Sequence, residues 1–410
     1  MSAESRASYC TVQIDITTDE RSQEKQKKIT KMCQGGDASS SLTEGFAEQL
    51  IASKFDGLTP LQLSDLTYEQ TAGGGGKGAV LLMRHAKCGQ RIAVKVVRRS
   101  ALCSDAARSN ALRERQLLIG DNSLSHPMLA AGIACFKDAE RLFLAMEFVP
   151  GGDLYSFMSE RRALKPREVS FIVGSITLML EYLHGRRIAY RDLKPENLMI
   201  GANGYVKLID FGLCKELGEA ERTYTVCGTP IYMSPERFSA RSGHGLESDW
   251  WSLGVLFFEL TFSSLPFSMF GPPPSDDEVA EKICDPTFMP SLLDDVAGYP
   301  GVGPTITSLM AQLMASDPAE RADAAMVKSH AFFKGFDFDK LLRQELTPLV
   351  TPALNGAEDG PCDDAPLPPI ARSSTLARIA ARGDSADELL ALDARPYHDA
   401  VPPGEWDELW

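Results

Sequence analysis

The segment Tyr190-Arg-Asp-Leu-Lys-Pro-Glu-Asn197 carries two cations, two acids and an amide within eight residues. An apolar run with helical spacing, 171–183, precedes it, and a β-like run, 198–209, follows it. This change of period predicts a loop between a helix and a strand.

Two further motifs extend this hypothesis. Asp210-Phe-Gly212 begins 18 residues after Asp192 (210 − 192). Far upstream, the pattern G-x-G-x-x-G-x-V is matched by Gly73, Gly75, Gly78 and Val80. Because glycine has no Cβ, the backbone N–H groups of such a loop can approach the phosphates of a nucleotide closely.

The polar residues of these motifs suit phosphoryl transfer. Asn197 and Asp210 supply the oxygen ligands that Mg²⁺ prefers. Asp192 stands where a hydroxyl must be oriented and its proton accepted. Lys194 can neutralise charge on the group being transferred. The three motifs together therefore predict a phosphoryl-transfer site.

In order and spacing, the motifs resemble the signature of eukaryotic protein kinases, with Tyr190 in place of the usual histidine. The strings Asp-Phe-Gly-Leu-Cys-Lys at 210–215 and Cys-Gly-Thr-Pro at 227–230 resemble the AGC group, in particular cAMP-dependent protein kinase and protein kinase B. This resemblance implies an α+β, two-lobed fold with a small β-rich N-lobe and a larger helical C-lobe. It also implies transfer of the γ-phosphoryl of ATP, with Mg²⁺, to serine or threonine.

The resemblance implies further residues of the ATP site. Lys95 lies in Ala-Val-Lys, fifteen residues after Val80, and would hold the α- and β-phosphates. Glu114, nineteen residues after Lys95, would pair with it. The positions expected to contact adenine and ribose are the gatekeeper Met146, the hinge residues Glu147, Phe148 and Val149, and Asp153.

Substrate recognition is implied in the same way. Glu196 and Glu259 match acidic positions that bind arginines upstream of the acceptor, and Asp153 would help. Carboxylates suit this task because a guanidinium binds them through two parallel hydrogen bonds. Thr229 is expected to hydrogen-bond near the catalytic loop, which in the family accompanies serine/threonine specificity. Proteins with basic motifs are therefore the expected partners.

The segment from Asp210 to Glu236 resembles an activation segment, and Thr225 matches its activating phosphosite. Arg191 and Lys215 are the expected partners of that phosphate. The sequence leaves open whether an upstream kinase or the chain itself modifies Thr225.

Two structural contacts are also expected by resemblance. Asp249 would brace the backbone of the catalytic loop, and Arg321 would pair with Glu236.

The expected domains are an N-terminal extension at 1–65, a kinase domain at 66–333 and an AGC-type tail at 334–410. Within the kinase domain, the N-lobe is expected at 66–149 and the C-lobe at 150–333. The extension is predicted to be partly disordered, with a short helix near 42–54. A stretch rich in Pro, Gly and Asp, 270–304, is predicted as an inserted loop. Trp406 and Trp410 resemble a hydrophobic motif, although the family spaces these aromatics by three residues rather than four.

Composition limits the class of protein. Hydrophobic residues make up 44% and the net charge is −14, which argues against a nucleic-acid-binding surface and favours basic partners. Nine dispersed cysteines without a C-x-x-C pair indicate reduced thiols, and hence a cytoplasmic or nuclear location. No apolar run reaches the roughly 18 residues that a membrane span needs.

Two other functions fit the same motifs. A pseudokinase or scaffold would bind nucleotide or partners without catalysis, but Lys95, Glu114, Asp192, Asn197 and Asp210 are all present. A small-molecule phosphotransferase would have no use for an activation segment. We therefore expect an active serine/threonine protein kinase.

Overall fold

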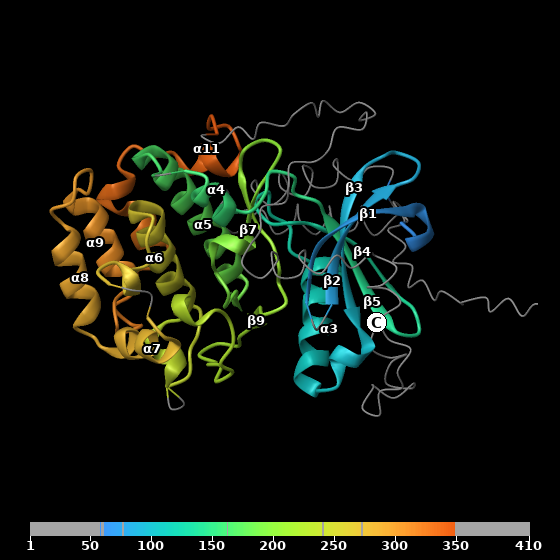
Figure 1. Ribbon diagram of the computed structural model, residues 1–410, viewed down its shortest axis with the longest axis horizontal. Helices are drawn as coiled ribbons and strands as arrows, with labels where there is room; N and C mark the ends of the chain where they lie inside the picture. Colours follow the sequence, from blue (N-terminus) through green and yellow to red (C-terminus); the bar gives the residue numbers. More distant parts are fainter. Residues whose placement is uncertain are drawn as a thin grey trace, which may run out of the picture. The chain divides into compact units, whose positions relative to one another are not determined.

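The computed structural model describes Leu58 and residues 61–75, 78–161, 163–239, 242–271 and 274–348 (Figure 1). The chain divides into two compact units, the first ending at Phe148 and the second beginning at Val149. The helix expected near 42–54 and the tail with Trp406 and Trp410 lie outside the described residues.

The first unit is built on a five-stranded antiparallel sheet with the strand order β1-β2-β3-β5-β4. Its elements are the short helices η1 (Leu63–Asp65) and η2 (Arg99–Leu102), the helix α3 (Asp105–Ile119), and the strands β1 (Leu66–Gly75), β2 (Gly78–His85), β3 (Arg91–Arg98), β4 (Gly132–Lys137) and β5 (Arg141–Glu147).

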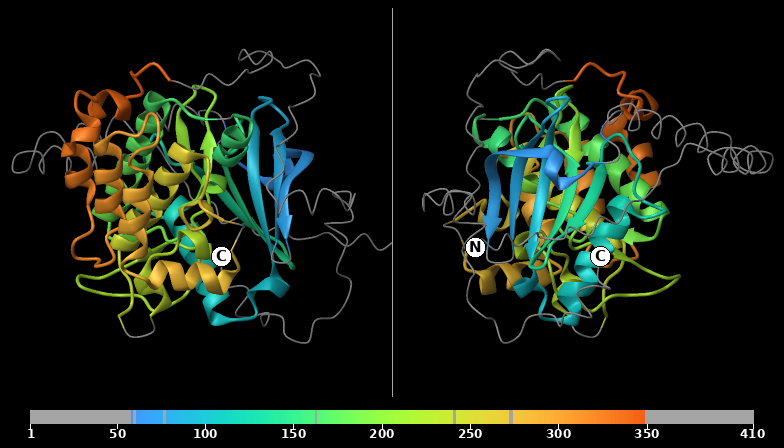
Figure 2. Two further views of the ribbon diagram at one scale, coloured as in Figure 1. Left: turned by 60° about the vertical axis from the view of Figure 1, so that its left-hand side comes forward. Right: turned by 90° about the vertical axis from the view of Figure 1, so that its right-hand side faces the viewer.

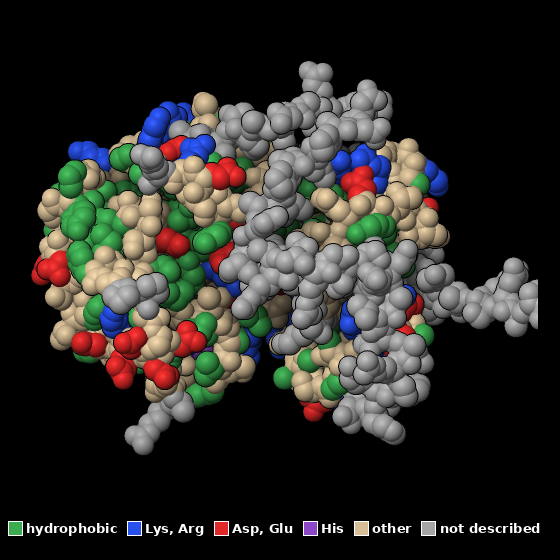
Figure 3. Space-filling model, in the orientation of Figure 1, with side chains coloured by type: hydrophobic (Ala, Val, Ile, Leu, Met, Phe, Trp, Pro, Cys, Tyr) green, Lys and Arg blue, Asp and Glu red, His purple; other side chains and the backbone are tan. Residues whose placement is uncertain are grey.

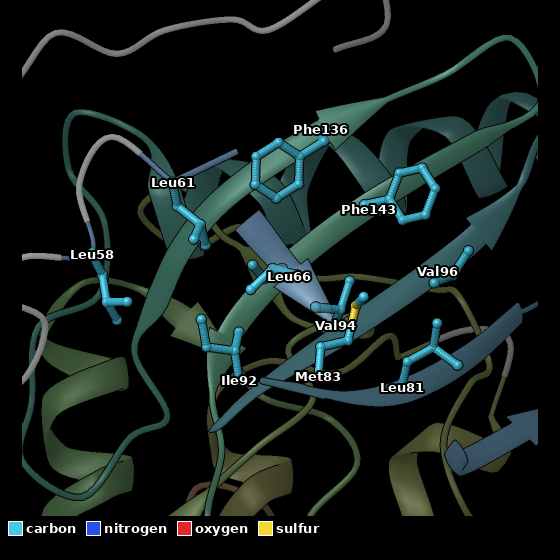
Figure 4. Packing of buried hydrophobic residues seen from close by; sticks show 11 residues of the cluster. Leu58, Leu61, Leu66, Leu81, Met83, Ile92, Val94, Val96, Phe136 and Phe143 are labelled. Carbon is cyan, nitrogen blue, oxygen red and sulfur yellow. The ribbon is translucent and has the colours of Figure 1, made fainter. Parts of the chain in front are cut away.

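Strand β3 shows why this sheet has a buried face. Ile92, Val94 and Val96 are buried at every second position, whereas Lys95 between them is half-buried. The three apolar side chains join one core cluster (Figure 4). A strand turns successive side chains to opposite faces, so Lys95 faces away from this cluster. Leu58 belongs to the same cluster, so chain that precedes the sheet helps to bury it. Burying each such aliphatic side chain stabilises the unit by roughly 1.5–3 kcal/mol.

Helix α3 packs beside strand β4 (Figure 2). The helix begins after Ser104, whose hydroxyl accepts a hydrogen bond from the N–H of Ala107 at 3.2 Å. Its buried side chains recur at helical spacing and are Ala111, Glu114, Leu117 and Leu118. A carboxylate thus lies on the buried face of this helix, where it needs a partner.

The second unit is mainly helical. Its helices are α4 (Leu154–Ser159), α5 (Pro166–Gly185), α6 (Glu247–Phe262), α7 (Asp276–Cys284), α8 (Phe288–Val296), α9 (Pro304–Leu313), α10 (Ala324–Ser329) and α11 (Phe338–Leu342). Its short helical turns are η3 (Pro195–Asn197), η4 (Pro230–Tyr232), η5 (Pro235–Phe238), η6 (Pro266–Ser268) and η7 (Ala331–Phe333), and its strands are β6 (Ile188–Ala189), β7 (Leu198–Ile200), β8 (Val206–Leu208) and β9 (Lys215–Glu216). Strand β6 precedes the segment 190–197 in the chain, and β7, β8 and β9 follow it. Strand β6 pairs with β9, and β7 pairs with β8. The predicted α+β class, with a β-sheet unit followed by a helical unit, is confirmed.

The prediction of an inserted loop at 270–304 is wrong, because α7 and α8 lie within it. Ser275 forms a capping box with Glu278, and Val279 and Ile283 are buried four residues apart. In α8 the buried residues are Met289, Leu292, Leu293 and Val296. Polar and acidic residues between these apolar positions obscured the helical period. The acidic side chains of α7 lie on the exposed face of the helix (Figure 3).

Within the described residues, no helix combines the length and the apolar character required to cross a membrane.

Candidate active site

The segment 190–197 is fixed by a carboxylate from helix α6. Asp249 Oδ2 accepts a hydrogen bond from the N–H of Tyr190, and Oδ1 accepts one from the N–H of Arg191, both at 2.8 Å. His184 Nε2 also lies 2.8 Å from Oδ2. Burial opposes ionisation of Asp249, but these hydrogen bonds and the charge of His184 outweigh it and lower the carboxyl pKa. The predicted bracing of the loop by Asp249 is confirmed. These hydrogen bonds stabilise Arg191 in a left-handed backbone conformation, with a φ of 72°.

Four side chains predicted for catalysis and metal binding meet in a closed set of contacts. Asp192 Oδ1 accepts hydrogen bonds from the N–H of Thr229 at 3.0 Å and from its hydroxyl at 2.9 Å. Lys194 Nζ lies 2.9 Å from the Thr229 hydroxyl and 3.0 Å from Asp192 Oδ2. Asn197 Nδ2 donates to the main-chain oxygen of Asp192 at 2.8 Å and to its Oδ2 at 3.0 Å. One carboxylate is thus oriented by a cation, a hydroxyl and an amide.

The residues expected to bind Mg²⁺ offer oxygen atoms of the kind that it prefers. Asn197 makes both of its hydrogen bonds to Asp192 through the side-chain nitrogen, so its amide oxygen is the candidate ligand for a cation. Asp210 is exposed, has a left-handed φ of 56° and accepts a hydrogen bond from the N–H of Gly212 at 3.2 Å. The Tyr190 hydroxyl donates to the main-chain oxygen of Ile209 at 2.6 Å and so links the two motifs. A carboxylate and an amide oxygen fit Mg²⁺.

Two threonines of the activation segment, Thr223 and Thr225, differ in their exposure. Thr223 is 1% exposed, and its hydroxyl lies 3.5 Å from Arg191 Nη1. Thr225, the predicted phosphosite, is exposed. Arg191 Nε also donates to the main-chain oxygen of Leu213 at 2.7 Å. Lys215, the other predicted phosphate partner, lies 3.5 Å from Glu221.

Arg237 belongs to this site and was missed by sequence reasoning. It is 3% exposed, and its Nη1 donates to the main-chain oxygen of Arg191 at 3.0 Å. Its Nη2 donates to the main-chain oxygen of Cys227. Burial lowers the pKa of this guanidinium. The sequence offers only an arginine after Ser-Pro-Glu, and no spacing indicates that it reaches back to the catalytic loop.

The close approach of these segments also requires glycine at 228. Gly228 has a φ of 95°, and a Cβ built there would lie 2.5 Å from the main-chain oxygen of Arg191. The catalytic loop and the activation segment therefore touch through backbone atoms.

The two predicted substrate-binding acids influence each other. Glu259 is 9% exposed and accepts a hydrogen bond from the Tyr232 hydroxyl at 2.6 Å. Burial, together with the charge of Glu196, raises the pKa of Glu259 to about 7, although the hydrogen bond from Tyr232 opposes the shift. Glu196 Oε2 is buried and accepts no hydrogen bond within the described residues. Asp153 is buried and caps α4, because its Oδ1 accepts a hydrogen bond from the N–H of Ser156 at 2.7 Å.

The predicted pairing of Glu236 with Arg321 is confirmed. Arg321 Nη1 and Nη2 lie 2.8 Å and 3.1 Å from the two carboxylate oxygens, and both residues are buried. Ser248 also donates to Glu236 at 2.8 Å. Burial opposes ionisation of Glu236, but Arg321 outweighs it and lowers the carboxyl pKa. This pair fixes the end of the activation segment.

In the first unit, the structure brings together two residues predicted for the ATP site. Lys95 Nζ lies 2.6 Å from Glu114 Oε1, which gives the buried carboxylate of α3 its cation. Val80 lies opposite Lys95 in the sheet. Gly78 lies so close to the main-chain oxygen of Val96 that a Cβ would collide with it.

The remaining predicted ATP-site residues are placed as follows. In the sheet, Gly73 pairs with Val80, and Gly75 pairs with Gly78. Met146 lies opposite Ala93 of β3, and Glu147 lies opposite Ile92. Phe148 ends the first unit, and Val149 is buried in the second.

Comparisons with known proteins agree on one class. A family model described as "Protein kinase domain" matches residues 66–333. "Serine/threonine-protein kinase N2" of Danio rerio is 35% identical over 304 residues, which cover 72% of this chain and 30% of that protein. "RAC-beta serine/threonine-protein kinase A" of Xenopus laevis is 32% identical over 319 residues, 76% of this chain and 62% of that protein.

A shorter relative is matched over most of its length. "cAMP-dependent protein kinase, catalytic subunit-like" of Caenorhabditis elegans is 33% identical over 309 residues, 74% of this chain and 73% of that protein. The chain thus spans less than two thirds of the Danio and Xenopus relatives.

Proposed function

The chain belongs to the protein kinase family, in the AGC group of serine/threonine kinases, and from this premise we propose that it transfers the γ-phosphoryl of ATP to serine or threonine in arginine-containing protein substrates. The observation that carries the proposal is the contact set of Asp192, Lys194 and Thr229. It holds a carboxylate and a cation side by side, as transfer to a hydroxyl requires.

The proposed roles follow from this geometry. Asp192 accepts the proton of the attacking hydroxyl and orients it, a contribution typical of a positioned base. Lys194 neutralises charge on the phosphoryl group as it moves. Thr229 hydrogen-bonds to both side chains and fixes their relative position, so these side chains need little reorganisation when the substrate binds. When bound, Mg²⁺ would supply charge neutralisation at the phosphates, held by Asn197 and Asp210.

In the first unit, Lys95 would bind the α- and β-phosphates while Glu114 fixes its position. The glycines at 73, 75 and 78 would allow the backbone to cover the phosphates.

Preference for basic substrates rests on Glu196 and Glu259. Their mutual repulsion in a buried setting is an electrostatic cost that an arginine guanidinium would relieve. The Oε2 of Glu196, which accepts no hydrogen bond from the described part of the chain, gives such a guanidinium an acceptor. We therefore propose that these acids select arginine upstream of the acceptor residue.

Regulation by phosphorylation of Thr225 is part of the proposal. The residue is exposed and so is open to another kinase or to a second copy of this chain. A phosphate there would add about −1.5 to −2 charge, and its proposed partners are Arg191 and Lys215. The proposed location is the cytoplasm, with the nucleus as alternative, on the strength of the dispersed cysteines, of which the six described are free thiols.

The deciding experiment measures phosphate transfer from Mg²⁺-ATP to a library of serine and threonine peptides, with Asp192→Asn as the control. We expect transfer that favours upstream arginines and that disappears in the variant. Nucleotide binding without any transfer would instead support the scaffold alternative. Phosphorylated small molecules without phosphopeptides would support a small-molecule phosphotransferase.

A further inference from the structure

Outside the proposed active site, the turn between strands β2 and β3 brings a thiol and an imidazole together. His85 ends β2, and Cys88 follows three residues later. The Cys88 Sγ lies 2.9 Å from His85 Nδ1. Cys88 is exposed, whereas His85 is 5% exposed. A thiol that solvent can reach therefore faces an imidazole held in the fold.

The backbone determines the role of Nδ1. The N–H of Cys88 points at the same nitrogen, at 3.3 Å. A backbone N–H can only donate, so Nδ1 carries the lone pair and the ring proton is on Nε2. The thiol of Cys88 is then a second donor to Nδ1. The sulfur thus lies beside a base that is oriented to receive its proton.

The turn itself holds this arrangement. The N–H of His85 donates to the main-chain oxygen of Gln90 at 2.8 Å, and the N–H of Gly89 donates to that of His85 at 2.8 Å. Arg84 Nη1 donates to the oxygen of Gly89 at 3.2 Å. Three hydrogen bonds therefore close the turn around Cys88, and the contact between thiol and imidazole is preorganised.

The other exposed cysteines of the described residues, Cys103 and Cys284, have different surroundings. Cys103 Sγ lies 2.7 Å from the main-chain oxygen of Ser100, an acceptor that binds a thiol proton but cannot remove it. Partial burial raises the pKa of the Cys284 thiol, which keeps it protonated. These two residues are internal references for Cys88.

We propose that Cys88 is a site of thiol–disulfide exchange that takes a small-molecule disulfide, with His85 as the proton acceptor. The Cys88 sulfur attacks one sulfur of the disulfide while its proton passes to His85 Nδ1. The disulfide bond of the small molecule breaks, and a new bond joins Cys88 to one half of it. The electron pair leaves with the other half as a thiolate, which then takes up a proton. Cys88 is oxidised and the released thiol is reduced, so no further oxidant is needed.

The experiment exposes the full chain to glutathione disulfide, quenches samples with acid and measures the mixed disulfide at each cysteine by peptide mass spectrometry. We expect Cys88 to react at least about tenfold faster than Cys103 in the same molecule. In His85→Asn the amide oxygen can still accept the N–H of Cys88 but is too weak a base to take a thiol proton. The Cys88 rate then falls to that of Cys103, whose own rate is unchanged.

Equal rates for Cys88 and Cys103 in the unmodified chain, or an unchanged Cys88 rate in His85→Asn, would overturn the proposal. If the variant does not fold, the unmodified chain is compared with and without urea. Urea separates His85 from Cys88, so the ratio of the two rates must fall toward one. A ratio that urea leaves unchanged would also exclude a role for His85.

Discussion

Arg237 donates from Nη1 to the main-chain oxygen of Arg191 at 3.0 Å, and so holds the catalytic loop one residue before Asp192. Its Nη2 holds the activation segment at Cys227, two residues before Thr229. The two segments that orient the Asp192 carboxylate thus share one buried cation from η5.

Arg237→Leu should lower kcat by up to about 100-fold, because small displacements of a reacting group are costly. Arg237→Lys keeps one donor and should lose less. KM for ATP should stay constant in both variants, since the proposed phosphate ligand Lys95 pairs with Glu114 in the other unit. Steady-state kinetics with thermal melts provides the check, and a higher KM for ATP at normal kcat would exclude a positioning role.

Asp192→Asn should reduce turnover by about 10²–10⁴-fold, because the amide cannot accept the substrate proton. ATP binding should persist, since Asn can still accept a hydrogen bond from the N–H of Thr229. Transfer to a peptide and binding of a fluorescent nucleotide measure the two effects separately. Asp277→Asn, which changes an exposed acid of α7, is the matched control. Retained turnover in Asp192→Asn would remove this residue from its role.

Activity toward arginine-containing peptides should depend on the ionisation of Glu259. Its pKa is raised to about 7, so the carboxylate forms as pH rises through this value. KM for an arginine-containing peptide should therefore fall from about pH 6 to about pH 8. In Glu259→Gln this dependence should disappear. A peptide without arginine is the control, and an equal pH dependence for both peptides would contradict the assignment.

The same pKa shift has a consequence for stability, with a defined sign. The native state keeps the Glu259 proton longer than the unfolded chain, whose carboxyl titrates near 4.5. The stability that this proton contributes is fully present below about pH 4.5 and is lost as pH rises through about 7. Glu259→Gln should therefore gain stability relative to the unmodified chain as pH rises over this window. Chemical denaturation at a series of pH values measures the difference.

Thr225→Ala should lower kcat if phosphate at this exposed position orders the activation segment. The measurement pairs peptide kinetics with mass-spectrometric detection of phosphate on the chain. Thr305→Ala, an exposed threonine at the start of α9, is the control. Full activity of Thr225→Ala would mean that the segment is ordered without phosphate.

Arg321→Met should cost about 3–5 kcal/mol of unfolding free energy, because it leaves the Glu236 carboxylate buried without its cation. The double variant Glu236→Leu/Arg321→Met should recover much of this loss. Denaturant titrations of both variants test the claim. A double variant as unstable as the single one would show that the stabilisation comes from other contacts of Arg321.

The sequence allowed prediction where chemistry fixes both residue type and spacing. Lys95 could be paired with Glu114, and Asp249 assigned to the catalytic loop, because the resemblance implies both contacts. Arg237 could not be predicted, because its partners are main-chain oxygens and so leave no mark in the sequence. Helices α7 and α8 were missed since prolines, glycines and acids surround their few apolar positions.

The anchoring of the loop by Asp249 also fixes an order of events during synthesis. Arg191 leaves the ribosome 58 residues before the carboxylate that binds its N–H. Glu236 emerges 85 residues before Arg321. A nascent chain can therefore complete the five-stranded sheet while its catalytic loop still lacks an anchor. The left-handed conformation of Arg191 gains its hydrogen bond from Asp249 only after α6 has folded, so an incomplete chain carries the motifs of the enzyme without the contacts that fix its loop.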